Sequence, residues 1–410
     1  MNTGLAQSAP FMAETSETKR NREPKAPQDR IKESPAFRQG GLKIELPVLS
    51  YSAINGENCV QSVFYFFFVI FALMLLTGCE TAKTGVSAQD GGDSVKTVIV
   101  STLAGSTAGF ADGIGSAAQF YYPDGIAIDA TGNLYVVDSS NRRIRKVTPK
   151  GEVSTLGNAA GIRSAVQFFL PFGIAIDAAG NLFVTDIFND RIRKVTPKGE
   201  VSTLAGGEKG FADGVGDVAQ FDIPSGIAID AAGNLFVADT WNSRIRKVTP
   251  EGEVSTLAGG IQGFADSIGN AAQFDCPRGI TIDKAGNLYV ADTINHRIRK
   301  VTPKGEVSTL AGSTAGFADG IGSAAQFYYP DGIAIDATGN LYVADTFNHR
   351  IRKVTPKGEV STLAGGTAGF ADGIGSAAQF HFTNGIAIDA AGNLYVTDSE
   401  NHRIRKIVIE

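Results

Sequence analysis

This sequence has few cysteines, no excess of basic residues and no helical periodicity. Three cysteines in 410 residues cannot form the dense disulfide framework on which many small secreted domains depend. Lys and Arg number 37 against 42 Asp and Glu, so there is no basic excess. Nucleic acid is therefore not an expected partner, because its binding rests on phosphate contacts. No segment keeps an apolar period of 3.6, which argues against helices longer than a turn or two.

Motifs of catalytic sites are also missing. The sequence has no Gly-x-Ser-x-Gly elbow, no phosphate-binding loop and no Cys-His pair in a recognisable context. Residues 101–138 and 308–345 differ only at Val137 and Ala344. Segments this alike have not acquired the asymmetric constellation that an active site requires. We therefore expect no catalytic residue and no cofactor.

A fixed repeat is what the sequence does contain. The phrase Gly-Ile-Ala-Ile-Asp, or a close relative, recurs at steps of 48, 53, 53, 53 and 53 residues. The six copies start at Gly125, Gly173, Gly226, Gly279, Gly332 and Gly385. A period of this length indicates a supersecondary unit that can bury its apolar faces only against its neighbours.

Each repeat has the pattern of four short strands. In residues 332–363, four segments rich in β-branched and aromatic residues are separated by Gly, Pro, Asn and Asp. Leu341 and Val343 fall on one face of the second strand, and Tyr342 and Ala344 fall on the other, so both faces of the sheet need cover. Six such sheets predict an all-β, six-bladed propeller, with Ile-Ala-Ile on the innermost strand. The Arg and Lys of the third strand are expected near the rim with their charges in water. A stacked β-solenoid is the competing architecture.

The two ends of the repeat array complement each other. The last repeat stops after its third strand, at Ile409, and residues 97–103 match the fourth strand that it lacks. We expect this N-terminal strand to complete the last blade and close the ring, which removes an unpaired edge.

Two motifs resemble those of the NHL repeat. One is Asn-His-Arg-Ile, and the other is the inter-blade linker Gly-Phe-Ala-Asp-Gly-Ile-Gly-Ser-Ala-Ala-Gln-Phe of many bacterial NHL proteins. They begin at Asn295, Asn348 and Asn401, and at Gly109, Gly316 and Gly369, respectively. The resemblance covers residues 97–410 and implies a propeller that serves in binding. The second repeat departs from it, because its linker, residues 157–168, is five residues shorter and lacks Phe-Ala-Asp-Gly.

The segment before the repeats resembles an export signal. Residues 63–76 are fourteen uncharged, apolar residues, fewer than the about 20 that a membrane span needs and suited to a signal peptide. The following residues, ending in Thr77, Gly78 and Cys79, resemble a bacterial lipobox, so 63–79 is interpreted as a lipoprotein signal. The resemblance implies lipidation of Cys79 and attachment to the cell membrane or outer membrane, facing the periplasm or exterior. The alternative is a signal-anchor helix in which Cys79 is incidental.

The other non-repetitive segments are polar. Residues 1–62 are either disordered or lie upstream of the true start of translation, and residues 80–96 have the composition of a flexible linker. The propeller then spans residues 97–410, and we expect it to be a monomer.

Variation among the repeats predicts a binding face. The strand order places the inter-blade linkers and the second turns on one face, where the repeats differ most. Aromatic residues and Arg at such positions are typical anchors for a protein or a cell-envelope polymer. The alternative is that these are neutral loop positions or pack against a neighbouring linker. The predicted face comprises Asp124, Phe172, Phe188, Ser225, Trp241, Arg278, Ile294, Asp331, Phe347 and Asn384, with Ser140 and Glu400 at the remaining second turns.

Repeated polar residues could be metal ligands, but their repetition favours structural roles. His296, His349 and His402 occupy one position in three consecutive blades, too far apart to converge on one zinc ion, and His381 is a fourth histidine. Each loop aspartate, at Asp112, Asp213, Asp266, Asp319 and Asp372, offers one carboxylate where calcium needs six to eight oxygens, and an Asx turn is the expected role. The aspartates that end the second strands are expected to hold the second turns. No metal is predicted.

The sequence thus predicts a lipid-anchored, non-catalytic binding or scaffolding propeller. The alternative function is that of a propeller-type lyase or lactonase with a metal on the axis.

Overall fold

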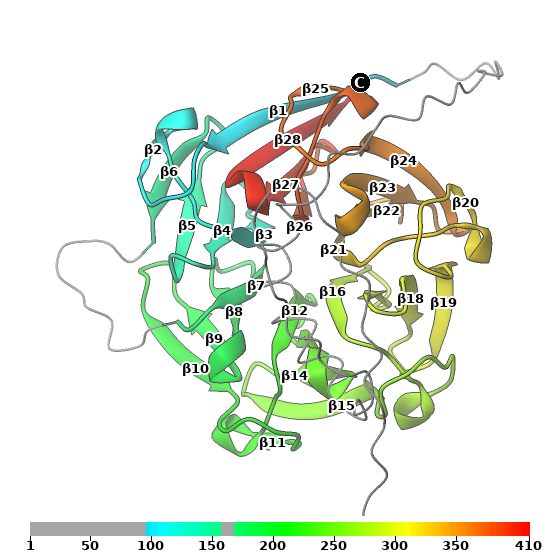
Figure 1. Ribbon diagram of the computed structural model, residues 1–410. Helices are drawn as coiled ribbons and strands as arrows, with labels where there is room; N and C mark the ends of the chain where they lie inside the picture. Colours follow the sequence, from blue (N-terminus) through cyan, green and yellow to red (C-terminus); the bar gives the residue numbers. More distant parts are fainter. Residues whose placement is uncertain (1–95, 157–167) are drawn as a thin grey trace, which may run out of the picture. The chain divides into compact units, whose positions relative to one another are not determined.

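Residues 96–156 and 168–410 are described by the structure, which is a computed structural model. Six antiparallel sheets stand around a common centre, as Figure 1 shows. Their innermost strands contact one another in a closed ring, which excludes an open stack. The prediction of a six-bladed propeller is confirmed. The expected lipidation residue Cys79 and the segments 1–62, 63–79 and 80–95 lie outside the described residues.

In blades 1 to 5 the four main strands follow one another in chain order from the axis outward, and in blade 6 the fourth strand is the N-terminal one. Blade 1 contains β3 (Pro123–Ile128), β4 (Leu134–Asp138), β5 (Arg143–Val147) and β6 (Glu152–Thr155). Blade 2 contains β7 (Pro171–Ile176), β8 (Leu182–Asp186), β9 (Arg191–Val195) and β10 (Val201–Ala205). Blade 3 contains β12 (Pro224–Ile229), β13 (Leu235–Asp239), β14 (Arg244–Val248) and β15 (Glu253–Gly259).

The second half of the ring repeats this arrangement. Blade 4 contains β16 (Pro277–Ile282), β17 (Leu288–Asp292), β18 (Arg297–Val301) and β19 (Val307–Gly312). Blade 5 contains β21 (Pro330–Ile335), β22 (Leu341–Asp345), β23 (Arg350–Val354) and β24 (Glu359–Gly365). Blade 6 contains β26 (Thr383–Ile388), β27 (Leu394–Asp398), β28 (Arg403–Ile409) and β1 (Val98–Gly105).

Short elements of the linkers and second turns complete the blades. The linkers add a fifth strand of two residues to four blades: β2 (Gly113–Ile114), β11 (Gly214–Val215), β20 (Gly320–Ile321) and β25 (Gly373–Ile374). The five linkers that the structure describes in full also form a 3₁₀ turn each: η1 (Gly115–Ala117), η3 (Gly216–Val218), η5 (Gly269–Ala271), η6 (Gly322–Ala324) and η8 (Gly375–Ala377). Four second turns are 3₁₀ as well: η2 (Ile187–Asn189), η4 (Thr240–Asn242), η7 (Thr346–Asn348) and η9 (Ser399–Asn401).

The N-terminal strand closes the ring, as predicted. β1, blue in Figure 1, lies antiparallel beside the red β28, and their register runs from Val98 opposite Ile409 to Gly105 opposite Arg403. Thr102 adds a side-chain connection, because its backbone N–H and its hydroxyl donate to the two carboxylate oxygens of Asp372, at 3.2 and 3.0 Å. The last blade is therefore assembled from both ends of the repeat array.

Apolar contacts between neighbouring blades form the core. Leu341 and Val343 of blade 5 pack in one cluster with Tyr289 of blade 4, whereas Tyr342 and Ala344 pack in another with residues of blade 6. The two faces of one strand thus serve two different interfaces, as the alternation of the sequence predicted. No blade can bury its surface alone.

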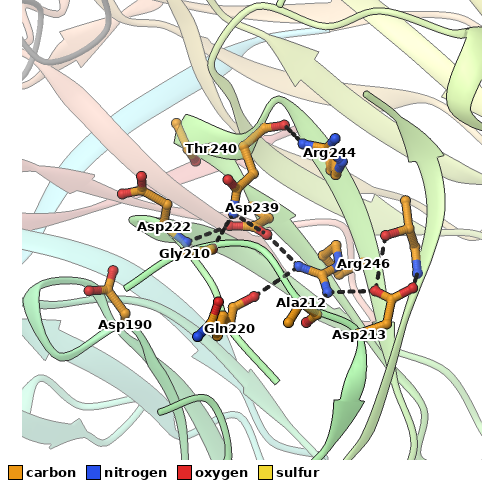
Figure 2. A network of polar contacts seen from close by, with 12 residues as sticks. Asp190, Gly210, Ala212, Asp213, Gln220, Asp222, Asp239, Thr240, Arg244 and Arg246 are labelled. Carbon is orange, nitrogen blue, oxygen red and sulfur yellow. Dashed lines mark hydrogen bonds and ion pairs between the residues drawn. The ribbon is translucent and has the colours of Figure 1, made fainter. Parts of the chain in front are cut away.

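The middle arginine of the third strand corrects the prediction that these charges stay in water. In five blades it is fully buried: Arg145, Arg246, Arg299, Arg352 and Arg405. Figure 2 shows the arrangement in blade 3, where Arg246 Nη1 donates to Asp239 Oδ2 and Nη2 donates to Asp213 Oδ1, both at 2.7 Å. Carbonyl oxygens of Gln220 and Ala212 accept further hydrogen bonds from the same two nitrogens. Burial is tolerated because two carboxylates and two carbonyls replace water around the guanidinium.

The loop aspartates are therefore not the Asx turns that the sequence suggested. Asp213 binds Arg246 and also accepts from the hydroxyl of Thr256, at 3.1 Å, so it ties the linker to the third and fourth strands. The aspartates that end the second strands do hold the second turns, as expected. Asp239 accepts from the side chain of Asn242, at 2.9 Å, and from the backbone N–H of Asp222, at 2.9 Å.

Candidate binding face and axial cavity

The residues that precede the repeated glycines gather around the propeller axis. They lie at the start of the innermost strands, and five of the six predicted positions line one small cavity at an end of the central channel. These five are Asp124, Phe172, Arg278, Asp331 and Asn384. Ser225 does not line the cavity, because it is buried and its hydroxyl is hydrogen-bonded to that of Thr240, at 2.8 Å.

The glycines themselves explain why the strands converge so closely. A Cβ built on Gly332 would lie 1.8 Å from the carbonyl oxygen of Asn384 in the next blade, and one on Gly279 would lie 1.9 Å from that of Asp331. The same close approach recurs at all six blade junctions. Only glycine permits this contact, so the repeated Gly-Ile-Ala-Ile motif sets the width of the channel.

Polar contacts between blades order the side chains in the cavity. Arg278 Nε lies 3.2 Å from Asp331 Oδ2, and the guanidinium stands 4.9 Å from the centre of the Phe172 ring. Asn384 Nδ2 donates to Asp124 Oδ1 at 2.6 Å. Four blades of the ring are linked in two pairs, blades 4 and 5 by an ion pair and blades 6 and 1 by a hydrogen bond.

Burial dominates the electrostatics of the two carboxyl groups. Burial raises the pKa of Asp124 to about 6, and the hydrogen bond from Asn384 opposes this rise. Burial also raises the pKa of Asp331, and the positive charge of Arg278 opposes this rise. With a pKa of about 6, Asp124 is mainly a carboxylate at neutral pH.

The size of the cavity limits what it can enclose. Its volume is about 80 Å³. Pockets for drug-sized ligands measure about 300–1,000 Å³, so this cavity is several times smaller. The cavity can hold a small group at the centre of a wider contact surface, but not a whole organic substrate.

The axial donors do not fit a divalent metal ion. Asp331 is already paired with Arg278, whose guanidinium would repel a cation, and Asp124 is bonded to Asn384. No group of three or more His, Cys, Asp or Glu side chains within residues 96–156 and 168–410 is arranged to hold a metal. Calcium needs six to eight oxygen ligands, and zinc needs about four ligands that converge on one point.

The repeated histidines lie at the blade junctions and not on the axis. His296 Nδ1 accepts a hydrogen bond from the backbone N–H of Tyr329 in the next blade, at 3.3 Å, and His402 Nδ1 accepts from that of Tyr122, at 3.4 Å. Asp190 acts in the same way towards the N–H of Ile223, at 3.0 Å. A hydrogen bond from this position joins successive blades in these three cases, whereas His349 contacts the next blade through the rings of His381 and Phe382.

The second-turn residues form a wider circle outside the axial ring. Phe188 is 40% exposed and its ring lies 5.4 Å from that of Phe169. Lys209 lies over the ring of Trp241, 4.7 Å from its centre. Ile294, Ser140 and Glu400 occupy the equivalent positions in blades 4, 1 and 6 and are partly buried.

Phe347 shows how these aromatic side chains pack with one another. Its ring lies 4.8 Å from that of Tyr329 in its own blade and 4.9 Å from that of Phe382 in the next. The aromatic residues of the face thus contact neighbouring linkers and remain partly accessible at the same time.

A second group of aromatic residues on this face was missed by the sequence reasoning. They stand just before the first strand of a blade and include Tyr121 and Tyr328, which are 42% and 38% exposed. The residue that follows each of them adopts a left-handed backbone although it is not glycine, with φ of 51° at Tyr122 and 53° at Tyr329. This conformation is uncommon for such residues and turns the linker sharply into the strand. The aromatic pairs before Pro123 and Pro330 were the available signal.

No helix among the described residues is long and apolar enough to cross a membrane.

Comparisons with known proteins agree with the repeat pattern. The model of the NHL repeat matches residues 120–147, 221–248 and 380–407, and that of the SMP-30/Gluconolactonase/LRE-like region matches residues 270–364. NHL repeat-containing protein 2 of Bos taurus is 38% identical over 151 residues, which are 33% of this chain and 21% of that protein. Protein SUPPRESSOR OF QUENCHING 1, chloroplastic, of Arabidopsis thaliana is 30% identical over 277 residues, 49% of this chain and 26% of that protein. The chain therefore spans about a fifth to a quarter of the length of these relatives.

Solved structures share the fold at low sequence identity. An auxiliary nutrient binding protein from Bacteroides thetaiotaomicron superimposes with a TM-score of 0.60 at 20% identity, with 77% of each chain covered. A streptogramin B lyase superimposes with a TM-score of 0.51 at 13% identity, covering 77% of this chain and 98% of the other.

Proposed function

Because this chain is a six-bladed propeller of NHL repeats, we propose that it is a non-catalytic binding or scaffolding module. Its partner is a protein or a cell-envelope polymer, and the contact surface is the face formed by the inter-blade linkers and second turns. The observation that carries this proposal is the circle of partly exposed aromatic side chains around an axial cavity too small to enclose an organic substrate.

The composition of the face supports binding. Tyr121, Phe169, Phe188 and Tyr328 are each between 38% and 43% exposed, and they surround a polar centre that contains Arg278. Aromatic residues and Arg supply most of the affinity in many interfaces, and aromatic side chains lose little conformational freedom when they bind. The axial cavity can accept one small polar group of the partner at the middle of this surface.

Relatives provide weaker support in the same direction. Two Bacteroides propellers that share the fold carry the name auxiliary nutrient binding protein. Their identities of 20% and 19% establish the fold alone, so we take from them only that such a propeller is used for binding.

An enzyme is the second candidate function. It is favoured by the match of residues 270–364 to the SMP-30/Gluconolactonase/LRE-like model and by the likeness to a streptogramin B lyase. Against it stands the axial ion pair between Arg278 and Asp331, which occupies the place where a lactonase metal would need free donors. Elemental analysis of the purified protein separates the two candidates. One zinc or calcium ion per chain, released when Asp124 or Asp331 is replaced by Ala, would favour the enzyme.

Attachment to a membrane through Cys79 is part of the proposal. The expected location is the cell membrane or outer membrane, with the propeller as a monomer facing the periplasm or exterior. Metabolic labelling with palmitate and mass spectrometry of the mature N-terminus test it. The Cys79→Ser variant should lose the label, and peptides from before residue 63 in the mature protein would contradict the assignment of the signal.

Crosslinking in the native envelope tests the proposed face. Trp241→Ala and Phe347→Ala should each reduce capture of the partner, because each removes a large side chain from the circle. Lys357→Ala, in the Pro-Lys-Gly turn that belongs to the opposite face, is the matched control. Digestion of the captured material with protease or with glycosidase then tells a protein from a polymer. Equal capture by all three variants would show that the face is wrong.

A further inference from the structure

The axial cavity carries its hydrogen-bond acceptors on one side. Asp331 of blade 5, Asn384 of blade 6 and Asp124 of blade 1 all line it. These blades are consecutive in the closed ring, because β21 contacts β26 and β26 contacts β3 (Figure 1). Phe172 and Arg278, which line the cavity at the same position of the repeat, belong to blades 2 and 4. Three adjacent blades therefore form an arc of side-chain oxygen atoms.

One oxygen atom of this arc has no donor. Asn384 is 7% exposed, and its Nδ2 donates to Asp124 Oδ1 at 2.6 Å. Its Oδ1 has no hydrogen-bond partner among the described residues. A buried amide oxygen without a donor is unfavourable and uncommon in folded proteins. The arc is thus built to accept a hydrogen bond that the described part of the chain does not supply.

The charges around the cavity are also incompletely matched. Asp331 is paired with Arg278, whereas Asp124 receives its hydrogen bond from a neutral amide. Within residues 96–156 and 168–410, no Lys, Arg or His forms an ion pair with Asp124. Its pKa of about 6 leaves it mainly ionised at neutral pH. A buried carboxylate of this kind is stabilised by an added positive charge.

Access to the arc is narrow. The cavity measures about 80 Å³, and Asp124, Asp331 and Asn384 are 8%, 4% and 7% exposed. A group that reaches them must be compact and carried on a slender stem. The ammonium group of lysine meets both demands, because it has three donors on one nitrogen at the end of an unbranched chain. A guanidinium is a wider, planar fork, and the amino group of a sugar is attached directly to a ring.

We propose that the axial cavity receives the ammonium group of a lysine side chain from a partner protein, held by the oxygens of Asp124, Asn384 and Asp331. This inference rests on the proposed function and names the partner as a protein and its central contact as a lysine. The ammonium supplies the donor that Asn384 Oδ1 lacks and the positive charge that Asp124 lacks. Phe172 offers an apolar surface to the methylene groups of the stem.

The site differs from one for a divalent metal ion in charge and in the number of ligands. An ammonium carries one charge and needs three acceptors, whereas calcium needs six to eight oxygens. The ammonium can also lie beside Asp124 in blade 1, across the ring from Arg278 in blade 4. Repulsion from that guanidinium is further reduced by its pairing with Asp331.

A titration of the full chain with Nα-acetyl-lysine methylamide, followed by ligand-observed NMR, tests the cavity directly. We expect one saturable site per chain. The norleucine analogue, which has the aliphatic stem without the ammonium, should not bind. Nα-acetyl-arginine methylamide and glucosamine should bind more weakly than the lysine probe, because neither presents a narrow ammonium on a stem.

Asp124→Asn is the decisive variant. It removes the charge but retains the shape and an oxygen that accepts from Asn384, so the fold is preserved. Binding of the lysine probe should weaken about 10- to 150-fold, because a hydrogen bond between charged groups is lost. Asp217→Asn, which makes the same charge change in an exposed linker position, is the matched control and should bind the probe as wild type does.

The dependence on pH provides a readout that a purely structural role of Asp124 would not affect. Affinity for the probe should fall about tenfold from pH 7 to pH 5, because a carboxyl group with a pKa of about 6 becomes protonated. The other charged groups that act on it are Asp331, which raises this pKa, and Arg278, which lowers it. Asp124→Asn should remove this dependence.

Several results would overturn the proposal. They are an absence of saturable binding at millimolar probe, equal binding of the norleucine analogue, or equal affinity of wild type and Asp124→Asn. Competition by K⁺ or Na⁺ at the concentration of the probe would assign the cavity to an inorganic cation. Stronger binding of glucosamine would assign it to an envelope polymer.

The proposed face can fail independently of this inference. Trp241 and Phe347 do not line the cavity, so their replacement by alanine should leave binding of the lysine probe unchanged. Probe binding together with capture that neither variant reduces would refute the face alone. Capture that both variants reduce, without probe binding, would refute the lysine contact alone.

Discussion

A single methyl group at the axis provides a stringent test of how the blades converge. Gly332 does not have a left-handed backbone, so alanine at this position meets no penalty from its dihedral angles. Its Cβ would, however, lie 1.8 Å from the carbonyl oxygen of Asn384, and real Cβ contacts are essentially never shorter than 3.0 Å. The neighbouring backbone must therefore retreat by at least 1.2 Å, the difference between these two distances.

The closed ring makes this displacement costly. Overfilling a packed site typically costs 1–3 kcal/mol, and we expect Gly332→Ala to reach about 3 kcal/mol because the obstacle is backbone that cannot rotate away. Gly322, in the linker of the same blade, is the matched control. Its φ is +58° and a Cβ there would meet nothing within 4 Å, so its replacement by alanine costs about 1 kcal/mol of backbone strain alone.

Urea and thermal unfolding of the two variants measure the difference. With an unfolding entropy of about 2.1 cal/mol/K per residue over roughly 310 residues, Tm should fall by about 5 °C for Gly332→Ala and about 2 °C for Gly322→Ala. The axial variant should also change the pKa of Asp124, because Asn384 carries the hydrogen bond to that carboxylate. An equal fall in Tm for the two variants, or an unchanged pKa of Asp124 in Gly332→Ala, would refute the reasoning.

Three further predictions concern titration and closure. Burial, with smaller contributions from His381 and Arg350, lowers the pKa of His349 to about 4. Below pH 6.5 the unfolded chain therefore binds a proton at this histidine that the folded chain does not bind. The free energy of unfolding should be about 2 kcal/mol lower at pH 5 than at pH 7 for this reason. Urea titrations of wild type and His349→Gln at pH 7 and pH 5 measure this difference. The pKa of Asp124 is raised to about 6, so its stabilising contribution is complete below pH 3.8 and is lost as the pH rises through 6. Asp124→Asn should accordingly be about 2–3 kcal/mol more stable than wild type at pH 8 in the same assay, and a loss of stability there would contradict the assignment. Val100→Asp places a charge at a position that is 1% exposed in β1, and should release this strand, detected as rapid proteolysis within residues 97–105 while the rest of the ring resists.

Repetition made most of the architecture predictable. Six copies of one phrase fixed the number of blades, and the alternation at residues 341–344 identified two buried faces per sheet. Closure followed from the match between residues 97–103 and the strand that the last repeat lacks. The convergence of Asp124, Arg278 and Asn384 could also be inferred, because equivalent positions of a closed ring face one axis.

The burial of Arg246 and its equivalents could not be inferred in the same way. The linker aspartate that binds each of these arginines lies 33 residues upstream, in an Asp-Gly sequence that is typical of an ordinary turn. In the sequence, an arginine on the third strand also has the pattern of a charge exposed to solvent. The left-handed backbone at Tyr122 and Tyr329 was hidden for another reason: glycine usually marks this conformation, and here tyrosine occupies it. Pairings between distant segments and unmarked dihedral angles are what a single sequence conceals.

The closure by β1 sets the order of events during synthesis. Its partner strand β28 ends at Ile409, so β1, the first strand of the described residues, has no partner until nearly the whole chain has been synthesised. At translation rates of about 5–20 residues per second, the roughly 300 intervening residues take about 15–60 s. During that interval β1 carries unpaired backbone groups and the apolar residues Val98, Ile99 and Val100, which makes the nascent chain a client for holding chaperones.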